Sequence, residues 1–395
     1  MGFLIAVTLP HTSRIPLFLL LSLIILLGGC TGLRLGRVII PRPGDWRTFG
    51  RTPLRTSAAD GRIEPPLSLA WEYDLTAATA NGAPIVVDST VIVGTMRGEL
   101  HAVRLTDGKK LGWISLGDAI HGTPVAYESA VIVPLTNSRE SVVAYDLTEG
   151  RVLWKQACGD VETSLLLSGA RLFGGTTGGS FFCLDAASGT VRWTFSLPDN
   201  TRRKGIRSSP AAWRSIVVFG ADDGWLYALD AATGKLQWKH QADAPIVAPP
   251  VADSSLLVVG TMGGTVLALD PASGNLRWQR DVGGPVFGHS LLSMSRVVVA
   301  TTKGIISGLS ALTGEQLWTT EVGGPILAGP STAGDLVFIG TLRRELLALS
   351  LIDGKVLWKG TTEGRIKTSP VITSGLVIVT TDDRSMVAFR GEGKP

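Results

Sequence analysis

The sequence predicts an all-β protein, an eight-bladed β-propeller of four-stranded antiparallel blades. Three observations predict this fold. Tryptophans recur about every forty residues through most of the 395-residue chain. The intervals between them hold short β-branched runs and glycine or proline turns, and no helix fits between the runs. The last interval lacks one strand, which a segment ahead of the first interval can supply. Repeated four-strand units are typical of propellers, because each unit buries its apolar faces against its neighbours.

The composition supports a folded domain and excludes several classes of protein. Hydrophobic residues make up 45% and charged residues 18% of the chain, so a disordered chain is excluded. The net charge of +4 comes from arginines in the first 64 residues, and a nearly neutral repeat region disfavours nucleic-acid binding. Three cysteines exclude a disulfide scaffold and paired CxxC zinc sites. No HExxH or GxSxG motif occurs, so we assign no catalytic residue and no metal ligand.

Residues 1–29 are predicted to be a lipoprotein signal peptide. Arg14 precedes the apolar run 17–27, which is about half the ~20 residues that a membrane-spanning helix needs. Two small residues then precede Cys30, and this pattern resembles a bacterial lipobox. The resemblance implies cleavage before Cys30, lipidation of its thiol, and, because Asp is absent at position 31, an outer-membrane location facing the periplasm. A plain signal peptide with an incidental cysteine is the alternative.

Residues 30–66 are predicted to be a basic tether between the anchor and the folded domain. Prolines stiffen this segment, and arginines make it basic, among them Arg34, Arg37, Arg42, Arg47, Arg51 and Arg55. The arginines could lie on anionic lipid headgroups. A solvated spacer is the alternative.

The repeat unit has a recognisable turn between its third and fourth strands. An example is Asp230-Ala231-Ala232-Thr233-Gly234, which precedes Trp238. The Asp side chain can accept hydrogen bonds from backbone N–H groups, and the glycine can take a left-handed conformation, so the segment forms a short hairpin. A β-branched run such as 216–220 lies upstream, and a strand that begins with small residues and a proline comes before it.

The number of blades can be counted from the strands. Eight runs of three strands begin near positions 84, 124, 165, 210, 250, 290, 330 and 370, and the eighth has no fourth strand behind it. The segment around Trp71 is a fourth strand with no three-strand run before it. Pairing of these two orphans completes the eighth blade and removes an open sheet edge, which predicts one domain over residues 67–391. The tryptophans that we expect to dock neighbouring blades are Trp71, Trp113, Trp154, Trp193, Trp238, Trp278, Trp318 and Trp358.

The Ala-x-Asp-x-x-Thr/Ser-Gly-x-x-x-Trp series resembles the docking motif of quinoprotein-type (PQQ-like) propellers. The segment 45–50, followed by 69–75, is also similar to the opening of pyrroloquinoline quinone dehydrogenases. Within this superfamily, a lipoprotein of about 400 residues with one propeller most resembles the B component of the outer-membrane β-barrel assembly machinery. This resemblance implies a non-enzymatic adaptor without a cofactor, whose partner is an envelope protein such as the barrel-insertion protein.

A quinone-dependent dehydrogenase is the competing interpretation. Such enzymes need a calcium-binding carboxylate and amide set, a general-base Asp, a Trp under the quinone and, in many, adjacent cysteines. This chain has no Cys-Cys pair and no long insertions between its repeats, and Cys183 occupies a position that is Ala in most repeats. An envelope scaffold unrelated to barrel assembly is the third interpretation.

A partner site is predicted at the loops that enter the first strand of each blade. The residue three positions before each strand start gives the series Asn81, His121, Glu162, Arg207, Val247, Phe287, Leu327 and Lys367. Three consecutive members are apolar, so the arc of Val247, Phe287 and Leu327 beside Arg207 would suit a protein partner. The alternative is that these side chains only plug the mouth of the central channel. In the family, the resemblance implies contacts through Arg and Asp; here the acidic pair is missing, with only Asp243 nearby.

Overall fold

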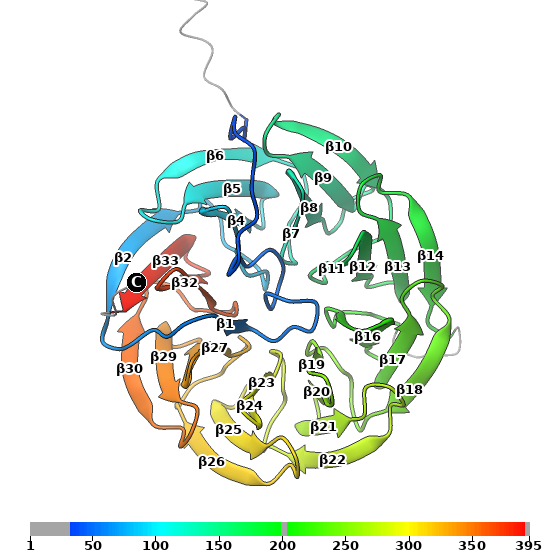
Figure 1. Cartoon of the computed structure of the whole chain (residues 1–395), viewed down its shortest axis with the longest axis vertical. Coiled ribbons are helices and arrows are strands. Elements are labelled where there is room, and N and C mark those ends of the chain that lie inside the picture. Colours follow the sequence, from blue (N-terminus) through cyan, green and yellow to red (C-terminus); the bar gives the residue numbers. More distant parts are fainter. Residues whose placement is uncertain (1–31, 199–203, 392–395) are drawn as a thin grey trace, which may run out of the picture.

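The computed structural model describes residues 32–198 and 204–391, and these form a closed ring of eight sheets around a central channel (Figure 1). Every named element in this part of the chain is a β-strand. Each sheet is one blade, with its first strand at the channel and its fourth at the rim. The predicted all-β, eight-bladed propeller is therefore confirmed.

Each blade is numbered by its order in the chain, and its strands are as follows. Blade 1 holds β3 (Ile85–Val87), β4 (Thr90–Gly94), β5 (Glu99–Arg104) and β6 (Lys110–Ser115); blade 2 holds β7 (Val125–Tyr127), β8 (Ala130–Pro134), β9 (Val142–Asp146) and β10 (Arg151–Gln156). Blade 3 holds β11 (Leu166–Ser168), β12 (Arg171–Gly175), β13 (Ser180–Asp185) and β14 (Val191–Ser196); blade 4 holds β15 (Ala211–Trp213), β16 (Ile216–Gly220), β17 (Trp225–Asp230) and β18 (Leu236–Gln241). Blade 5 holds β19 (Val251–Ala252), β20 (Leu257–Gly260), β21 (Thr265–Leu269) and β22 (Leu276–Asp281); blade 6 holds β23 (Leu291–Ser293), β24 (Arg296–Ala300), β25 (Ile305–Ser310) and β26 (Gln316–Glu321). Blade 7 holds β27 (Ser331–Ala333), β28 (Leu336–Gly340), β29 (Glu345–Ser350) and β30 (Val356–Thr361); blade 8 holds β31 (Val371–Thr373), β32 (Leu376–Thr380), β33 (Ser385–Gly391) and β2 (Leu67–Asp74).

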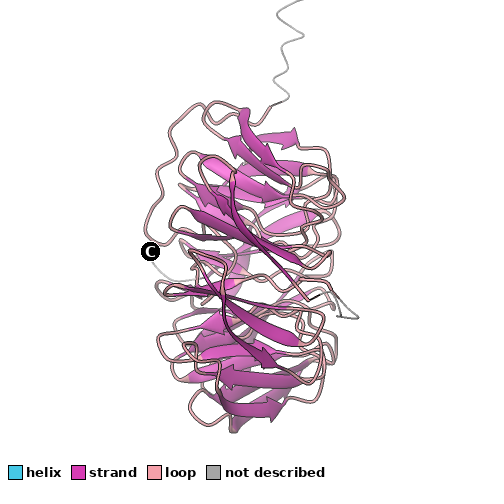
Figure 2. Ribbon diagram, turned by 90° about the vertical axis from the view of Figure 1, so that its right-hand side faces the viewer, coloured by secondary structure: helices cyan, strands magenta, loops and turns pink. Residues whose placement is uncertain are grey.

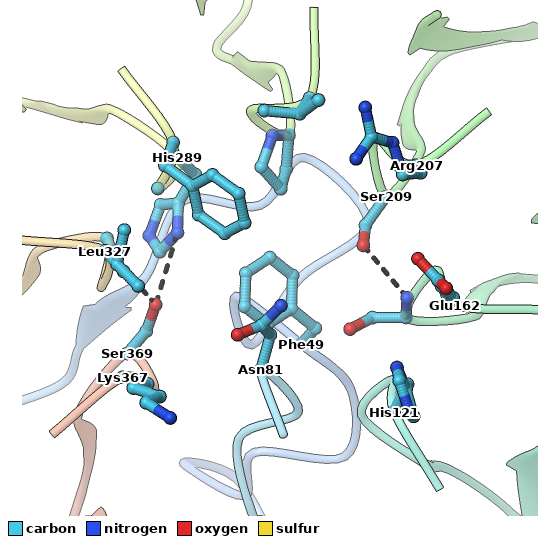
Figure 3. Close-up of a pocket in the computed structure, with 16 residues that line it drawn as sticks. Phe49, Asn81, His121, Glu162, Arg207, Ser209, His289, Leu327, Lys367 and Ser369 are labelled. Atoms are coloured by element: carbon cyan, nitrogen blue, oxygen red, sulfur yellow. Dashed lines mark hydrogen bonds between the residues drawn. The ribbon is translucent and has the colours of Figure 1, made fainter. Parts of the chain in front are cut away.

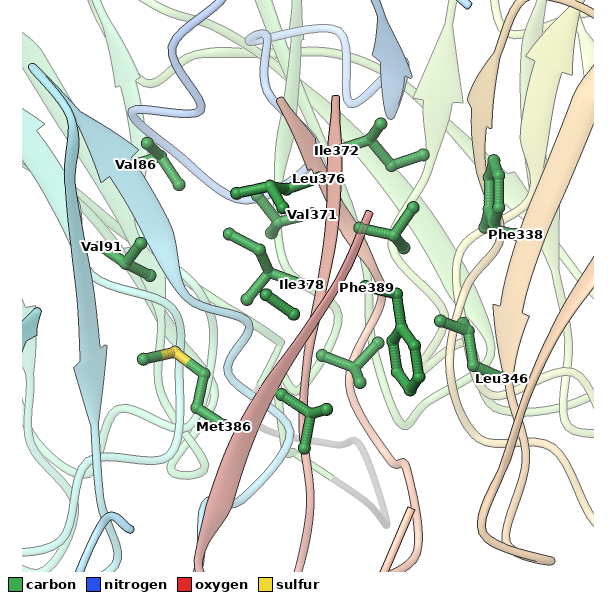
Figure 4. Close-up of a cluster of buried hydrophobic side chains, with 14 of the residues drawn as sticks. Val86, Val91, Phe338, Leu346, Val371, Ile372, Leu376, Ile378, Met386 and Phe389 are labelled. Carbon is green, nitrogen blue, oxygen red and sulfur yellow. The ribbon is translucent and has the colours of Figure 1, made fainter. Parts of the chain in front are cut away.

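The ring closes in blade 8, where the first long strand of the chain joins the last. Strand β2 pairs antiparallel with β33, and the register places Leu69 opposite Phe389 and Trp71 opposite Ala388. The two ends of the domain thus share one sheet, as the orphan strands predicted. The core of this region is a cluster of side chains from blades 7, 8 and 1, including Phe338, Ile378 and Val86 (Figure 4).

The turn between the third and fourth strands forms as its residues predict. In blade 4, the Asp230 Oδ1 accepts hydrogen bonds from the backbone N–H groups of Ala232 (3.1 Å) and Thr233 (2.8 Å). Gly234 follows with a φ of 72°, a left-handed conformation that glycine adopts without strain. The same Asp hydrogen bonds recur in blades 2, 3 and 5.

Six of the eight tryptophans lie on the turn glycine of the next blade. A Cβ on these glycines would approach the indole ring to between 2.3 and 2.8 Å, so only glycine fits there. The pairs are Trp71 with Gly108, Trp154 with Gly189, Trp193 with Gly234, Trp238 with Gly274, Trp278 with Gly314, and Trp318 with Gly354. Trp358 lies between blades 7 and 8, where its ring centroid is 5.4 Å from that of Phe389.

Trp113 differs from the predicted docking role. In seven blades the tryptophan pairs with the small or apolar residue of the third strand, whereas Trp113 pairs with His101 and Gly112 takes the docking position opposite Ala102. Its turn has the same length as the others, but Trp113 lies five residues after the turn glycine rather than four, and a shift of one residue reverses the direction of a side chain in a strand. Trp113 therefore stacks on His101, at a centroid distance of 6.1 Å, and leaves the seam between blades 1 and 2.

The described part of the expected tether, residues 32–66, is packed on the propeller rather than solvated. Leu33 is fully buried between blades 1 and 2, and Trp46 is 2% exposed. Both Arg37 and Arg42 form ion pairs with Asp88, and Arg51 pairs with Asp60. Three of the arginines that we expected on lipid headgroups thus bind carboxylates of the chain itself.

The middle of this segment enters the channel and hydrogen-bonds to the innermost strands. Backbone carbonyls of Trp46, Arg47, Pro53, Leu54 and Ser57 accept hydrogen bonds from N–H groups in the first strands of blades 1, 2, 4, 5 and 7. Strand β1 (Ala58–Ala59) adds to blade 7 beside β27, in parallel (Figure 1). We call residues 44–59 the plug, since they cross the channel and satisfy strand edges that would otherwise be open.

No helix in the described ranges has the length and apolar character needed to cross a membrane.

Candidate functional site: a cup at one mouth of the channel

The two faces of the ring differ in what covers the channel. Because neighbouring strands in a blade are antiparallel, the turns after first and third strands lie on one face, and the remaining turns and connections between blades lie on the other (Figure 2). Residues 33–43 contact the first of these faces, at Asp88 and Leu147, so we call it the N-terminal face. The opposite face carries the loops that enter each blade.

These entering loops form a cup on the face opposite the N-terminal face. We call the face that carries the cup the cup face. Its volume is about 180 Å³. All eight residues of the aligned series line it, together with Phe49 from the plug (Figure 3). The residues are Asn81, His121, Glu162, Arg207, Val247, Phe287, Leu327 and Lys367. Sequence positions about forty residues apart thus meet at one site because each blade brings the same loop to the axis.

Hydroxyl groups below the rim of the cup tie neighbouring blades together. The Ser164 Oγ accepts a hydrogen bond from the Thr123 N–H at 2.9 Å, and the Ser209 Oγ accepts one from the Ser164 N–H at 2.9 Å (Figure 3). On the other side, the Ser369 Oγ accepts a hydrogen bond from the Gly329 N–H at 3.1 Å. The cup therefore has a rigid wall built from backbone-bonded side chains.

The wall is apolar on one side. Val247 is buried, Phe287 and Leu327 are half-buried, and Pro249 continues this surface towards the floor. Phe49 forms part of the floor and meets His289 edge-on at a ring-centroid distance of 5.2 Å. This arc of apolar side chains is where a partner's apolar side chain would lose the most contact with water.

The opposite side of the cup is polar. The Arg207 guanidinium binds Asp222 through two nitrogens at 3.0 Å, and the Lys367 Nζ lies 3.1 Å from a carboxylate oxygen of Asp382. The side chains of Asn81, His121 and Glu162 make no hydrogen bond to any residue in the described ranges. A ligand or partner in the cup would thus find both apolar surface and unused polar groups.

His289 lies beneath the cup and is fully buried. Its Nε2 is 2.7 Å from the Ser57 Oγ of the plug and 3.0 Å from the Pro330 carbonyl, and its Nδ1 is 3.4 Å from the Ser369 Oγ. Burial lowers the pKa of His289 to about 4, so the ring is neutral near pH 7. These contacts make His289 a link between plug and ring rather than a reactive group.

Arg55 is the residue beneath the cup that sequence reasoning missed. It is fully buried, and its guanidinium donates hydrogen bonds to the carbonyls of Pro210 (2.8 Å), Leu165 (3.1 Å) and Phe49. Burial without a carboxylate beside it lowers the pKa of Arg55 to about 9. In the sequence Arg55 is one of seven arginines in a proline-containing stretch, and nothing in that pattern distinguishes it from its neighbours.

The cup does not fit a calcium-bound quinone. Calcium prefers six to eight oxygen ligands, and the lining of the cup includes one carboxylate, from Glu162. Among residues 32–198 and 204–391, no three His, Cys, Asp or Glu side chains lie together as metal ligands would. The two cysteines in these ranges, Cys158 and Cys183, are unpaired, and burial raises their thiol pKa values to about 12 and 11.

The predicted lipidation site, Cys30, lies outside the described residues. Arg207, Val247, Phe287 and Leu327 are brought to one cup, but the structure holds no partner that would test their role.

Comparison with known proteins gives relatives of two kinds. The family model described as "Outer membrane protein assembly factor BamB" matches residues 50–195, 138–285, 222–328 and 302–394. The dehydrogenase subunit of the quinone alcohol dehydrogenase of Gluconobacter oxydans is 30% identical over 220 residues, covering 50% of this chain and 24% of that protein. The assembly factor BamB of Kangiella koreensis is 27% identical over 180 residues, covering 42% of this chain and 45% of its own. The chain thus spans less than half the length of either relative.

The crystal structure of BamB from Moraxella catarrhalis has the same fold. It superposes with a TM-score of 0.69 at 19% identity, covering 82% of this chain and all of the other.

Proposed function

The chain belongs to the family of outer-membrane protein assembly factors described as BamB, and from this premise we propose that it is a non-enzymatic scaffold that holds an envelope protein at its cup. The proposed location is the outer membrane, through a lipid on Cys30, with the propeller in the periplasm. The proposed partner is the barrel-insertion protein of the outer membrane.

The observation that carries this proposal is the composition of the cup. Three neighbouring blades present Val247, Phe287 and Leu327 to one open site, and the next blade presents Arg207, held in place by Asp222. An apolar centre beside an ordered arginine is typical of the residues that dominate protein interfaces. Because the lining offers one carboxylate, the cup supports recognition of a partner better than metal-assisted chemistry.

The experiment is capture of the barrel-insertion protein from detergent-solubilised envelopes by the full chain. We expect Phe287→Glu and Arg207→Glu each to reduce the captured amount at least tenfold. The first would place a charge in the apolar arc, and the second would reverse a charge beside Asp222. The matched control is Leu276→Glu, an exposed apolar residue on the outer strand β22, far from the cup. Equal capture by all three variants would remove the cup from consideration as the binding site.

The quinoprotein relatives define the second candidate, a quinone-dependent dehydrogenase. Its test is addition of pyrroloquinoline quinone and calcium, followed by dye reduction with alcohols or aldose sugars. We expect no reduction above the rate without protein, because the residues of the cup do not fit the calcium-bound group. Reduction that saturates with quinone would overturn the scaffold proposal.

A further inference from the structure

The N-terminal segment fills the docking position that Trp113 leaves open. Leu33 is fully buried there, 3.2 Å from where a Cβ on Gly112 would lie, and Arg34 lies beside the turn glycine Gly150. The Tyr145 hydroxyl donates a hydrogen bond to the Leu33 carbonyl at 2.8 Å, and the Leu35 N–H donates one to the Leu147 carbonyl at 2.7 Å. The chain is therefore clamped to the rim of blades 1 and 2 from residue 33 onward.

This clamp limits how far the propeller can lie from an anchor at Cys30. Leu33 is three positions after Cys30, and three extended residues span at most about 11 Å. A free tether of residues 30–66 would let the ring turn in any direction, whereas a clamp this close holds one sector of the ring at the membrane.

The N-terminal face carries exposed apolar side chains, both on the clamped segment and, elsewhere on the ring, on turns of blades 6 and 7. Val38 is 69% exposed and Ile40 is 64% exposed on the clamped segment itself. Turns of blades 6 and 7 add Met294, Leu312 and Ile352 to the same face, each more than half exposed. On the cup face, by contrast, Met96 is the one large hydrophobic residue in a described turn that is exposed, at 40%. Apolar side chains beside basic ones are typical of surfaces that lie in a lipid headgroup region.

Arginines surround these apolar residues on the clamped segment. Arg34 and Arg47 are exposed and form no ion pair within the described residues, while Arg37 and Arg42 share the carboxylate of Asp88. Burial would raise the pKa of Asp88, but the hydrogen bond from Arg37 and the charges of both arginines hold it below its usual value. The Asp45 carboxylate also lies here, where it accepts hydrogen bonds from the backbone N–H groups of Arg42 and Asp88. Arg37 and Arg42 are therefore balanced by two carboxylates, and Arg34 and Arg47 supply the net positive charge of this surface.

A groove of about 520 Å³ adjoins this basic surface. It is lined by Pro41, Arg47, Arg51, Tyr127, Glu128 and Leu167, among others, so two arginines, one carboxylate and apolar side chains face the same space. Such a lining suits the phosphate and the upper acyl chain of an anionic lipid.

We propose that the N-terminal face of blades 1 and 2 lies on the anionic bilayer that holds the lipid anchor, so that the cup points away from the membrane. Val38 and Ile40 enter the headgroup region, and Arg34 and Arg47 bind lipid phosphates. The proposal rests on the anchor and location given under the proposed function, and it adds a fixed orientation.

The test places a fluorophore on each face of the full, processed chain in lipid vesicles. Ile40→Cys labels the N-terminal face and Met96→Cys labels the cup face of blade 1, both in a Cys158→Ser background because Cys158 is only partly buried. Vesicles contain phosphatidylglycerol and a nitroxide-labelled lipid that quenches fluorophores near the bilayer. We expect at least threefold more quenching at position 40 than at position 96. Equal quenching, or more at position 96, would overturn the orientation.

The role of charge is tested in the same vesicles. We expect the double variant Arg34→Ala, Arg47→Ala to halve the quenching at position 40, as should replacing phosphatidylglycerol with phosphatidylcholine. The matched control is Arg97→Ala, an exposed arginine in a cup-face turn of blade 1, which should leave quenching unchanged. Equal loss in the control and the double variant would contradict binding of lipid phosphates at the N-terminal face.

The mass of the mature protein separates this proposal from its premise. A mass without acyl chains would overturn the anchor and the orientation together, whereas capture by the cup would still stand on its own test. Acyl chains with equal quenching on both faces would overturn the orientation alone.

Discussion

Two levels of the central channel, the cup and the plug beneath it, differ in how their polar groups are bonded. Beneath the cup, Arg55 and His289 are fully buried and bonded to the plug and the ring. At the cup, Asn81, His121 and Glu162 line an open space and bond to no described residue. A buried polar group costs free energy unless it has a hydrogen-bond partner, whereas an exposed one contacts water and remains available to bind a ligand. The difference separates a plug built for stability from a cup available for binding.

Replacing Arg55 in the plug should have the largest effect on stability. The variant Arg55→Ala would leave the carbonyls of Pro210 and Leu165 without their donors and open a cavity beside Phe49. We expect the free energy of unfolding to fall by about 3–5 kcal/mol, measured by urea denaturation. The exposed Arg34→Ala should change it by less than about 0.5 kcal/mol. Equal effects would mean that the plug adds little to the stability of the ring.

Acidification should weaken the contact between plug and ring through His289. Its folded-state pKa of about 4 lies below the usual value of 6.5, so the unfolded chain binds the proton more readily as pH falls below about 6.5. The stability that the neutral ring provides is present above that pH and is lost towards pH 4. Between pH 8 and pH 5 the loss should be about 2 kcal/mol.

The variant His289→Gln isolates this contribution. Between pH 8 and pH 5, the free energy of unfolding of this variant should fall by about 2 kcal/mol less than that of the original chain, whatever the stability of the variant at pH 8. A pH dependence identical to that of the original chain would contradict the assigned protonation state.

At the cup, breaking an ion pair should have the smallest effect. The variant Asp222→Asn removes the carboxylate that binds Arg207, whose side chain is 47% exposed. We expect a loss of unfolding free energy of at most about 1 kcal/mol, since solvent screens exposed pairs. A loss as large as that of Arg55→Ala would mean that the cup, too, is built for stability.

The strand pattern allowed most of the ring to be predicted. Turn residues such as Asp230 and Gly234 act within a few positions of each other, so their role is visible in the chain. Closure by Trp71 and Phe389 followed from counting strands. Trp113 was assigned wrongly to a seam because a spacing of about forty residues hides a displacement by one position. The distance from Gly108, five residues instead of four, is the signal that would have found it.

The sequence by itself determined the blades, their number, their closure and the eight residues that line the cup, because these depend on a repeated local pattern. Only the tertiary structure decided that residues 32–66 clamp the rim and cross the channel, with Leu33 in a tryptophan's position and Arg55 buried among carbonyls. The physical reason is that this segment is bound by strand edges and a seam that exist only once the ring has formed. Its own proline and arginine composition is equally compatible with a solvated chain.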